Sequence, residues 1–161
     1  MKELTKAGTG PIYGFIIFTL TVLGIIFRKL VYLDVFYNLQ FIVFMHLLGF
    51  FFFLSGVFIW VHAVLISEIT KKIENTELMT TGIYAWVRNP IYTGISFFLM
   101  SILFFSKSVF SFILPFIFWI IMTLLVKPEE KVLERIFGDK YLQYKKRVNR
   151  CIPWFPQKRN H

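Results

Sequence analysis

The chain is organised around residues 78–94, which read LMTTGIYAWVRNPIYTG and join a polar connector to an apolar segment. Asparagine can cap a helix, and proline has no amide hydrogen to lose in a first helical turn. The pair Asn89 and Pro90 therefore predicts a helix that begins at Pro90, at the edge of the apolar segment. Such a helix start offers free amide hydrogens and a positive dipole end, which favour an anion-binding site. Further donors can come from Tyr84, Arg88 and Tyr92. The alternative is an interfacial anchor made of aromatic side chains and one arginine.

The composition is that of a small membrane protein. Of 161 residues, 57% are hydrophobic and 20% are aromatic, and the mean hydropathy is +0.64, which is too apolar for an ordinary soluble domain. The single cysteine, Cys151, excludes an internal disulfide, and the Cys and His spacing does not suggest a metal site. The net charge of +9 is carried beside apolar segments, so it indicates a membrane-facing basic surface rather than a nucleic-acid site.

Four apolar segments predict an all-α, polytopic membrane protein with a single domain over residues 1–161. The predicted transmembrane helices cover about residues 12–27, 39–65, 90–105 and 109–126. The first could also be a signal peptide, but no small-residue cleavage site follows it, which favours a retained span. The second exceeds the roughly 20 residues that a bilayer needs. The last two are short and predict a tight hairpin. Within the fourth, Pro115 predicts a kink, and Lys127-Pro128 predicts its end.

A different kind of helix is predicted from Glu129 onward. Apolar residues on one side and charged residues elsewhere indicate an amphipathic, interfacial helix that Gly138 can interrupt. The aromatic and proline-rich residues 151–156 then suit a tail that folds back on the protein or the membrane surface.

The distribution of basic residues predicts that both termini are cytoplasmic. Four spans place the N-terminus, residues 66–89 and the C-terminal region on one side, which holds most of the basic residues, whereas the other side has only Arg28, Lys29 and Lys107. The polar regions 76–92 and 127–155 then face the same compartment and can form one pocket there. Glu129 and Glu130 can hold a cation in it, although acids in a first helical turn also merely complement the helix dipole. The residues alone predict a pocket for a zwitterionic ligand.

Several motifs together resemble the isoprenylcysteine carboxyl methyltransferase family, within a superfamily that includes phospholipid N-methyltransferases. They cover about residues 76–155 and consist of GIYAWVRNPIYTG at 82–94, Glu129-Glu130, FGDKYLQYKKRV at 137–148, and Ile152-Pro153. The resemblance implies an S-adenosylmethionine-dependent methyltransferase that acts at the cytosolic membrane face. Its acceptor would be lipophilic, a prenylcysteine-like carboxylate or a lipid head group, and would enter from the bilayer.

The resemblance also implies a set of site residues. The cofactor would contact Thr76, Glu77, Leu78, Met79, Tyr84, Asn89, Pro90, Ile91, Tyr92 and Glu129. Catalytic roles would fall to Arg88, Glu129 and Glu130. No metal, nucleic acid or second cofactor is implied.

Two positions depart from the family pattern. Asn89 stands where many relatives have histidine, which removes a titrating group but keeps a hydrogen-bond donor. Leu125 stands where the prenylcysteine enzymes have an arginine that is expected to hold the acceptor carboxylate, so methyl transfer is better supported than a prenylcysteine acceptor. Two alternatives are a membrane-embedded nicotinamide-dependent sterol-type reductase, suggested by the similar C-terminal stretch of that class, and a non-catalytic membrane scaffold.

Overall fold

The described part of the chain is entirely helical. The computed structural model describes residues 8–30, 38–66 and 77–153, and it contains no strand within these ranges. The all-α prediction is therefore confirmed for them. The longer helices are α2 (Gly10–Ile26), α3 (Leu39–Val61), α5 (Pro90–Phe105), α6 (Leu114–Phe137) and α7 (Asp139–Arg147), and the short ones are η1 (Phe27–Leu30), η3 (His62–Ile66), η4 (Gly82–Ala85) and η5 (Val109–Ser111).

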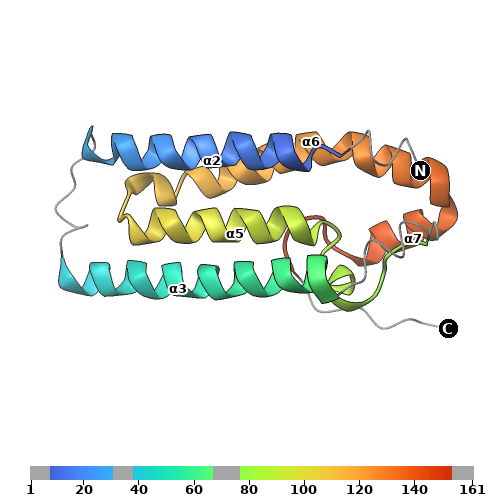
Figure 1. The fold of residues 1–161 in the computed structure, drawn as a ribbon, viewed down its shortest axis with the longest axis horizontal. Coiled ribbons are helices and arrows are strands. Elements are labelled where there is room, and N and C mark those ends of the chain that lie inside the picture. The colour runs from blue at the N-terminus through green and yellow to red at the C-terminus, as the bar shows by residue number, and fades with distance from the viewer. Residues whose placement is uncertain (1–7, 31–37, 67–76, 154–161) are drawn as a thin grey trace.

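Four of these helices form an elongated bundle in which successive helices run in opposite directions (Figure 1). Helix α5 lies in the middle, with α3 on one side and α2 and α6 on the other. Helix α6 extends beyond the bundle at one end, and α7 folds back from its tip. Because η3, the start of α5 and the far half of α6 all lie at this end, the polar segments gather there.

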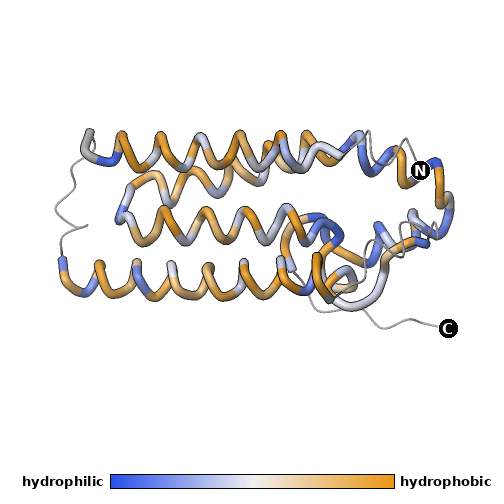
Figure 2. The backbone as a smooth tube through the Cα atoms, viewed as in Figure 1, coloured by the Kyte–Doolittle hydropathy of each residue, from blue (hydrophilic) through white to orange (hydrophobic). Residues whose placement is uncertain are grey.

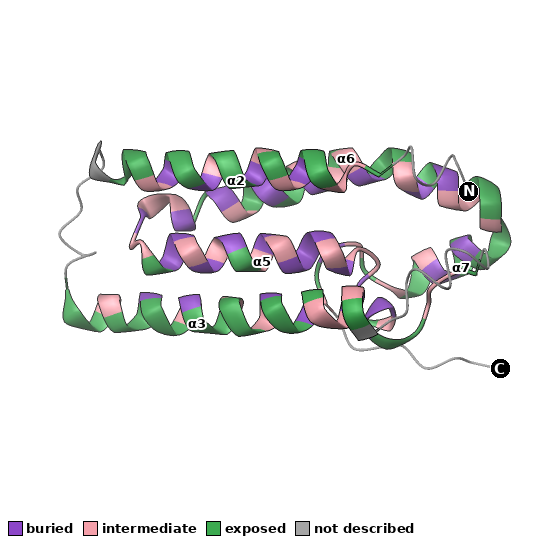
Figure 3. Cartoon of the chain, viewed as in Figure 1, coloured by how far each residue is buried: buried purple, intermediate pink, exposed green. Residues whose placement is uncertain are grey.

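The central position of α5 follows from its small and apolar residues. Leu99, Leu103 and Phe104 are buried, and purple buried positions are concentrated along α5 in Figure 3. The backbones of α3 and α5 approach closely at two glycines: a Cβ atom on Gly56 would lie 2.8 Å from the backbone nitrogen of Phe98 and 3.0 Å from the carbonyl oxygen of Gly94. The absence of side chains at this crossing allows α3 to pack on α5.

The outer surface of the bundle is strongly apolar. Large side chains on α3 remain exposed, such as Leu39 at 74%, Leu47 at 65% and Phe51 at 60%. The stretch Leu39–Leu65 is long and apolar enough to cross a membrane, and α2 and α5 are shorter apolar helices. Figure 2 shows hydrophobic residues along the four long helices, and hydrophilic ones mainly at the end that carries α7. An exposed apolar surface of this extent suits a lipid environment.

Helix α6 corrects three predictions about the fourth apolar segment. The helix begins at Leu114 after the short helix η5, so Pro115 lies in its first turn, where proline is tolerated, and causes no interior kink. It then runs through Pro128 to Phe137 instead of ending at Lys127-Pro128. Interior proline costs about 3 kcal/mol. Val126 and Val132 are buried on either side of the proline, and their packing favours a continuous helix.

The predicted helix from Glu129 is therefore two pieces, the far half of α6 and the separate helix α7. Gly138 separates them with φ 51° and ψ −129°, a conformation that favours glycine. The predicted interruption at Gly138 is confirmed. Because Glu129 and Glu130 lie in the interior of α6 and not in a first turn, the reading that they complement a helix dipole is wrong.

Candidate functional site

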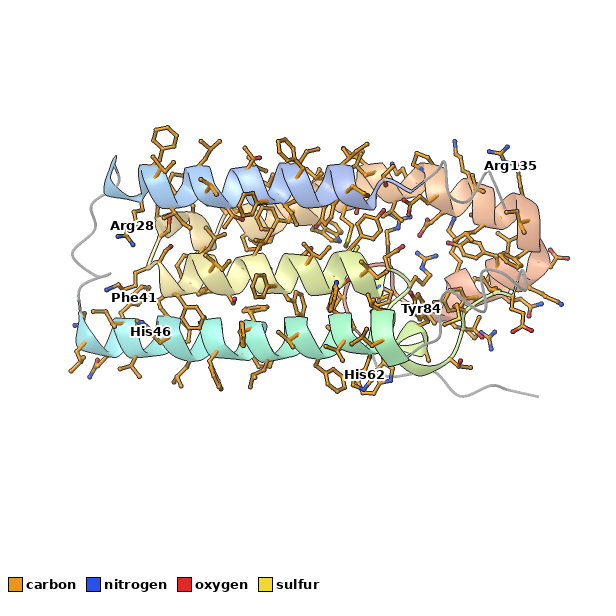
Figure 4. The ribbon with its side chains drawn as sticks, viewed as in Figure 1. Arg28, Phe41, His46, His62, Tyr84 and Arg135 are labelled. Carbon is orange, nitrogen blue, oxygen red and sulfur yellow. The ribbon has the colours of Figure 1, made fainter. Side chains whose placement is uncertain are left out.

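The candidate site lies at the end of the bundle where α6 and α7 extend. In Figure 4, Tyr84 and Arg135 lie toward this end, whereas Arg28 and Phe41 lie at the opposite one. The start of α2, the start of α5 and the interior of α6 meet here, although they are far apart in the sequence. Hydrogen bonds among their polar side chains define two adjacent clusters, one around Glu129 and one around Glu130.

The first cluster joins three helices at one carboxylate oxygen. Oε1 of Glu129 accepts hydrogen bonds from the Tyr92 hydroxyl at 2.6 Å and from the Thr9 backbone amide at 2.5 Å. The Thr9 hydroxyl lies 2.9 Å from the same oxygen. Within the described residues, no hydrogen bond uses Oε2. One oxygen of Glu129 is thus fixed by the protein, and no described residue bonds to the other.

The second cluster is an ion-pair network around Glu130, which is only 3% exposed. Arg150 binds both carboxylate oxygens, with Nε 3.0 Å from Oε1 and Nη2 2.8 Å from Oε2. Arg88 lies 3.2 Å from Oε1, and Lys145 lies 3.8 Å from Oε2 and also pairs with Glu134. The hydrogen bond to Glu130 raises the pKa of the Arg150 guanidinium. Successive residues on a helix point about 100° apart, which is why adjacent glutamates serve different neighbours.

Two nitrogens of the Arg88 guanidinium have no hydrogen-bond partner among the described residues. Its side chain is 8% exposed, and its Nε and Nη1 atoms are buried with no hydrogen-bond partner in the part of the chain that the structure describes. A buried, unpaired donor on a charged group is costly unless something satisfies it. Arg88 therefore has donor capacity for an anionic group that the described residues do not provide.

The chain after α7 returns to the start of α5. The backbone amides of Arg88 and Asn89 donate to the carbonyls of Asn149 and Arg150, at 2.8 and 3.3 Å. The Asn89 side chain also donates to the Arg150 carbonyl at 3.2 Å and does not cap α5. The predicted side-chain cap is thus wrong: the Asn89 side chain is used as a donor to the returning chain, and its oxygen accepts no bond from the helix start. The helix does begin at Pro90 as predicted.

Buried tyrosines line the region between η4 and α7. The Tyr144 hydroxyl donates to the Tyr84 carbonyl at 2.7 Å. Burial raises the pKa values of Tyr84, Tyr141 and Tyr144 above the ordinary value of 10.0. These hydroxyls therefore remain protonated and act as hydrogen-bond donors, which makes them poor general bases.

The remaining residues implied as cofactor contacts fall outside the two clusters. Thr76 lies outside the described residues. Glu77 is exposed, and Met79 and Ile91 pack against an apolar cluster that contains Tyr84. Among the described residues, no hydrogen bond or ion pair joins residues 77–79 to Glu129.

The sequence analysis did not identify three residues of the two clusters, Thr9, Lys145 and Arg150. The sequence Thr9-Gly10-Pro11 is a helix-start signal, but such a signal does not reveal a partner 120 residues away.

Two apolar grooves lie along the bundle. A groove of about 400 Å³ between α5 and α6 is lined by Ser96, Phe97, Phe116 and Trp119, and Thr93 and Cys151 also line it. The Thr93 hydroxyl donates to the Cys151 carbonyl at 2.9 Å. Burial raises the pKa of the Cys151 thiol to about 11, so the thiol stays neutral. The second groove, of about 470 Å³, lies among α2, α3 and α5.

Together these features define an all-helical protein with exposed apolar helix surfaces and an ion-paired polar layer at one end. The chain belongs to the phospholipid methyltransferase family, whose model matches residues 13–140.

Curated relatives agree with the resemblance to isoprenylcysteine carboxyl methyltransferases. The protein-S-isoprenylcysteine O-methyltransferase of Schizosaccharomyces pombe is 33% identical over 90 residues, which cover 54% of this chain and 37% of that protein. The Saccharomyces cerevisiae protein of the same name is 30% identical over 86 residues, 53% of this chain and 36% of its own length. Methanethiol S-methyltransferase 1 of Bradyrhizobium diazoefficiens is 30% identical over 95 residues, which cover 58% of this chain and 32% of that protein. The chain thus spans about a third of the length of these relatives. No solved structure matches it significantly.

Proposed function

We propose that this chain is an integral-membrane methyltransferase that takes its methyl group from S-adenosylmethionine and transfers it to a lipophilic acceptor. The observation that carries the proposal is the 2.6 Å hydrogen bond between Tyr92 and Glu129. It joins the first turn of α5, where the first amide hydrogens have no partner within the helix, to an acid on α6 whose second oxygen bonds to no described residue. One site can then bind both charges of a zwitterion, the negative charge at the amides of α5 and the positive charge at the acid of α6.

The chemistry of these donors fits the methionine portion of the cofactor. Its carboxylate suits the α5 N-terminus, where the amides of Ile91 and Tyr92 have no partner within the helix. Its ammonium suits Oε2 of Glu129, to which no described residue bonds, through a charge-assisted hydrogen bond. When bound, S-adenosylmethionine supplies an electrophilic methyl group on a sulfonium. The protein's part is to hold and orient the reactants and to exclude water, which needs no metal.

The acceptor is expected to have an anionic end and an apolar body. The buried Nε and Nη1 of Arg88 have no hydrogen-bond partner among the described residues, and either can donate to an anionic group in place of the arginine that Leu125 replaces. The groove between α5 and α6 offers apolar walls for a lipid chain. A carboxylate or thiolate acceptor needs no general base. Glu130 is held by two arginines, so it positions Arg88 and does not accept a proton.

The bilayer arrangement follows from the same features. Helices α2, α3 and α5 and the first part of α6 would cross the membrane, and α7 would lie at its cytoplasmic interface. The excess of Lys and Arg at the site end supports a cytoplasmic location for this end and for both termini.

Binding measurements on purified protein in lipid nanodiscs test the cofactor site. We expect S-adenosylmethionine to bind to the wild type. We expect Glu129→Ala to raise the Kd for it about tenfold or more, because a charged hydrogen bond contributes roughly 1.5–3 kcal/mol. Tyr92→Phe should weaken it less. Glu134→Ala is the matched control, because Glu134 lies on the same helix and pairs with Lys145 alone among the described residues. Unchanged affinity in both Glu129→Ala and Tyr92→Phe rejects this pocket, and binding of reduced nicotinamide instead favours a reductase.

Methyl-labelled S-adenosylmethionine identifies the acceptor class. Reconstituted protein is incubated with a prenylcysteine, with total lipid extract, or with methanethiol, which a relative's name makes a specific candidate. We expect label in a lipophilic anionic acceptor and loss of transfer in Arg88→Ala. Cofactor binding without transfer to any acceptor contradicts the proposed activity and favours a scaffold.

A further inference from the structure

The residue that precedes α2 makes an unusual set of contacts. Thr9 is the N-cap residue of α2, yet its side chain makes no capping hydrogen bond to its own helix. Its hydroxyl instead lies 2.9 Å from Oε1 of Glu129, 3.1 Å from the Tyr92 hydroxyl and 3.1 Å from the Leu125 carbonyl. Threonine usually satisfies its own helix start, so this side chain is used for a contact between helices.

The charges decide which of these contacts matters most. A threonine hydroxyl has one proton to donate, and the ionised carboxylate of Glu129 is the strongest acceptor among the three neighbours. The Thr9 backbone amide donates to the same oxygen at 2.5 Å, so the positive end of α2 also faces Glu129. Thr9 and Tyr92 together hold Oε1 from two sides. The rotation of the carboxylate is thereby fixed, and with it the direction of Oε2.

We infer that Thr9 is a positioning residue of the cofactor site, which orients Glu129 so that Oε2 meets the ammonium of S-adenosylmethionine. The inference rests on the proposed function and extends the site to the start of α2. Thr9 acts through Glu129 and touches no reacting atom. Pre-orientation of a binding group raises affinity because less freedom is lost when the ligand binds.

Three variants separate this role from a structural one. Thr9→Val removes the hydroxyl but keeps the shape, and Thr9→Ser restores the hydroxyl. Thr19→Val is the matched control, because Thr19 lies on the same helix and, among the described residues, its hydroxyl bonds to the Phe15 carbonyl of its own helix alone. The backbone amide of Thr9 is retained in all three variants, so the helix start keeps its contact with Glu129.

Two ligands provide the readout. S-adenosylhomocysteine carries the ammonium and carboxylate, whereas 5′-methylthioadenosine lacks both. We expect Thr9→Val to weaken the binding of S-adenosylhomocysteine about tenfold and to leave that of 5′-methylthioadenosine unchanged. Thr9→Ser and Thr19→Val should bind both ligands as the wild type does. Isothermal titration calorimetry in nanodiscs measures each Kd.

The outcomes distinguish this inference from the proposed function. If the wild type binds neither S-adenosylmethionine nor S-adenosylhomocysteine, the proposed function fails and the role of Thr9 fails with it. If Glu129→Ala weakens binding but Thr9→Val does not, only the inference about Thr9 is overturned. The inference is also overturned if Thr9→Val weakens the binding of both ligands equally, because a mispacked pocket would lose affinity whether or not the ligand has an ammonium. It is overturned as well if Thr9→Ser does not restore wild-type binding of S-adenosylhomocysteine.

Discussion

At the scale of single residues, the two adjacent glutamates of α6 have separate tasks. Glu129 bonds to Thr9 and Tyr92 through one oxygen, and no described residue bonds to its other oxygen. Glu130 is 3% exposed and is bound by Arg88, Arg150 and Lys145. A buried carboxylate with several cationic partners holds segments together and is a poor base or nucleophile. The resemblance assigns catalytic roles to both glutamates, and the surroundings of Glu130 argue for positioning instead.

Removal of Glu130 should destabilise the protein strongly. Glu130→Ala leaves Arg88 buried without its partner, and breaking a buried ion pair from one side costs about 3 kcal/mol or more. We expect a large fall in the thermal midpoint of the protein in detergent. Glu134→Ala removes a carboxylate that is 31% exposed, so it should change the free energy of unfolding by about 1 kcal/mol or less. Equal midpoints for the two variants would show that the buried network contributes no net stability.

At the scale of elements, the path of α6 builds the site. The helix continues through Pro128, so Glu129 and Glu130 stay on the same rigid rod as the apolar segment below them. It then ends at Gly138, where a positive φ reverses the chain into α7 and brings Lys145 and Arg150 back to Glu130. A helix that ended at Pro128 would place the glutamates on a separate, less constrained segment.

Gly138 is therefore expected to tolerate substitution poorly. Nothing lies within 4 Å of a Cβ atom placed on it, so the cost of Gly138→Ala is purely conformational, about 1 kcal/mol or more at φ 51°. Gly14→Ala is the matched control, because its Cβ also meets nothing and the residue lies inside α2, where alanine is favoured by about 1 kcal/mol. Thermal unfolding should show a lower midpoint for the first and an equal or higher one for the second. The reverse order would refute the conformational requirement.

At the scale of the whole molecule, the surface divides into an apolar body and a charged end. Exposed leucine and phenylalanine side chains cover the bundle, while the ion pairs lie at the end with α7. Under the proposed function, the charged end would meet the soluble cofactor and the apolar side would meet the lipophilic acceptor.

The proposed orientation is testable with reporter fusions in a bacterial host. A green fluorescent protein fused after the C-terminus should fluoresce, and alkaline phosphatase at the same place should be inactive, because both termini are predicted to be cytoplasmic. A fusion after Lys107, which follows α5, serves as the control and should give active phosphatase. Active phosphatase at the C-terminus together with inactive phosphatase at Lys107 would invert the topology.

The sequence by itself determined the helical class, the positions of the first three apolar helices and the helix start at Pro90. These features are local, because hydrophobic segments, proline and capping residues act on their own neighbourhood. Only the tertiary structure decided that α6 continues through Pro128, that Asn89 bonds to Arg150 and that Thr9 contacts Glu129. Packing and ion pairs between distant segments outweigh local preferences of a few kcal/mol, and a single sequence does not show which distant side chains will meet.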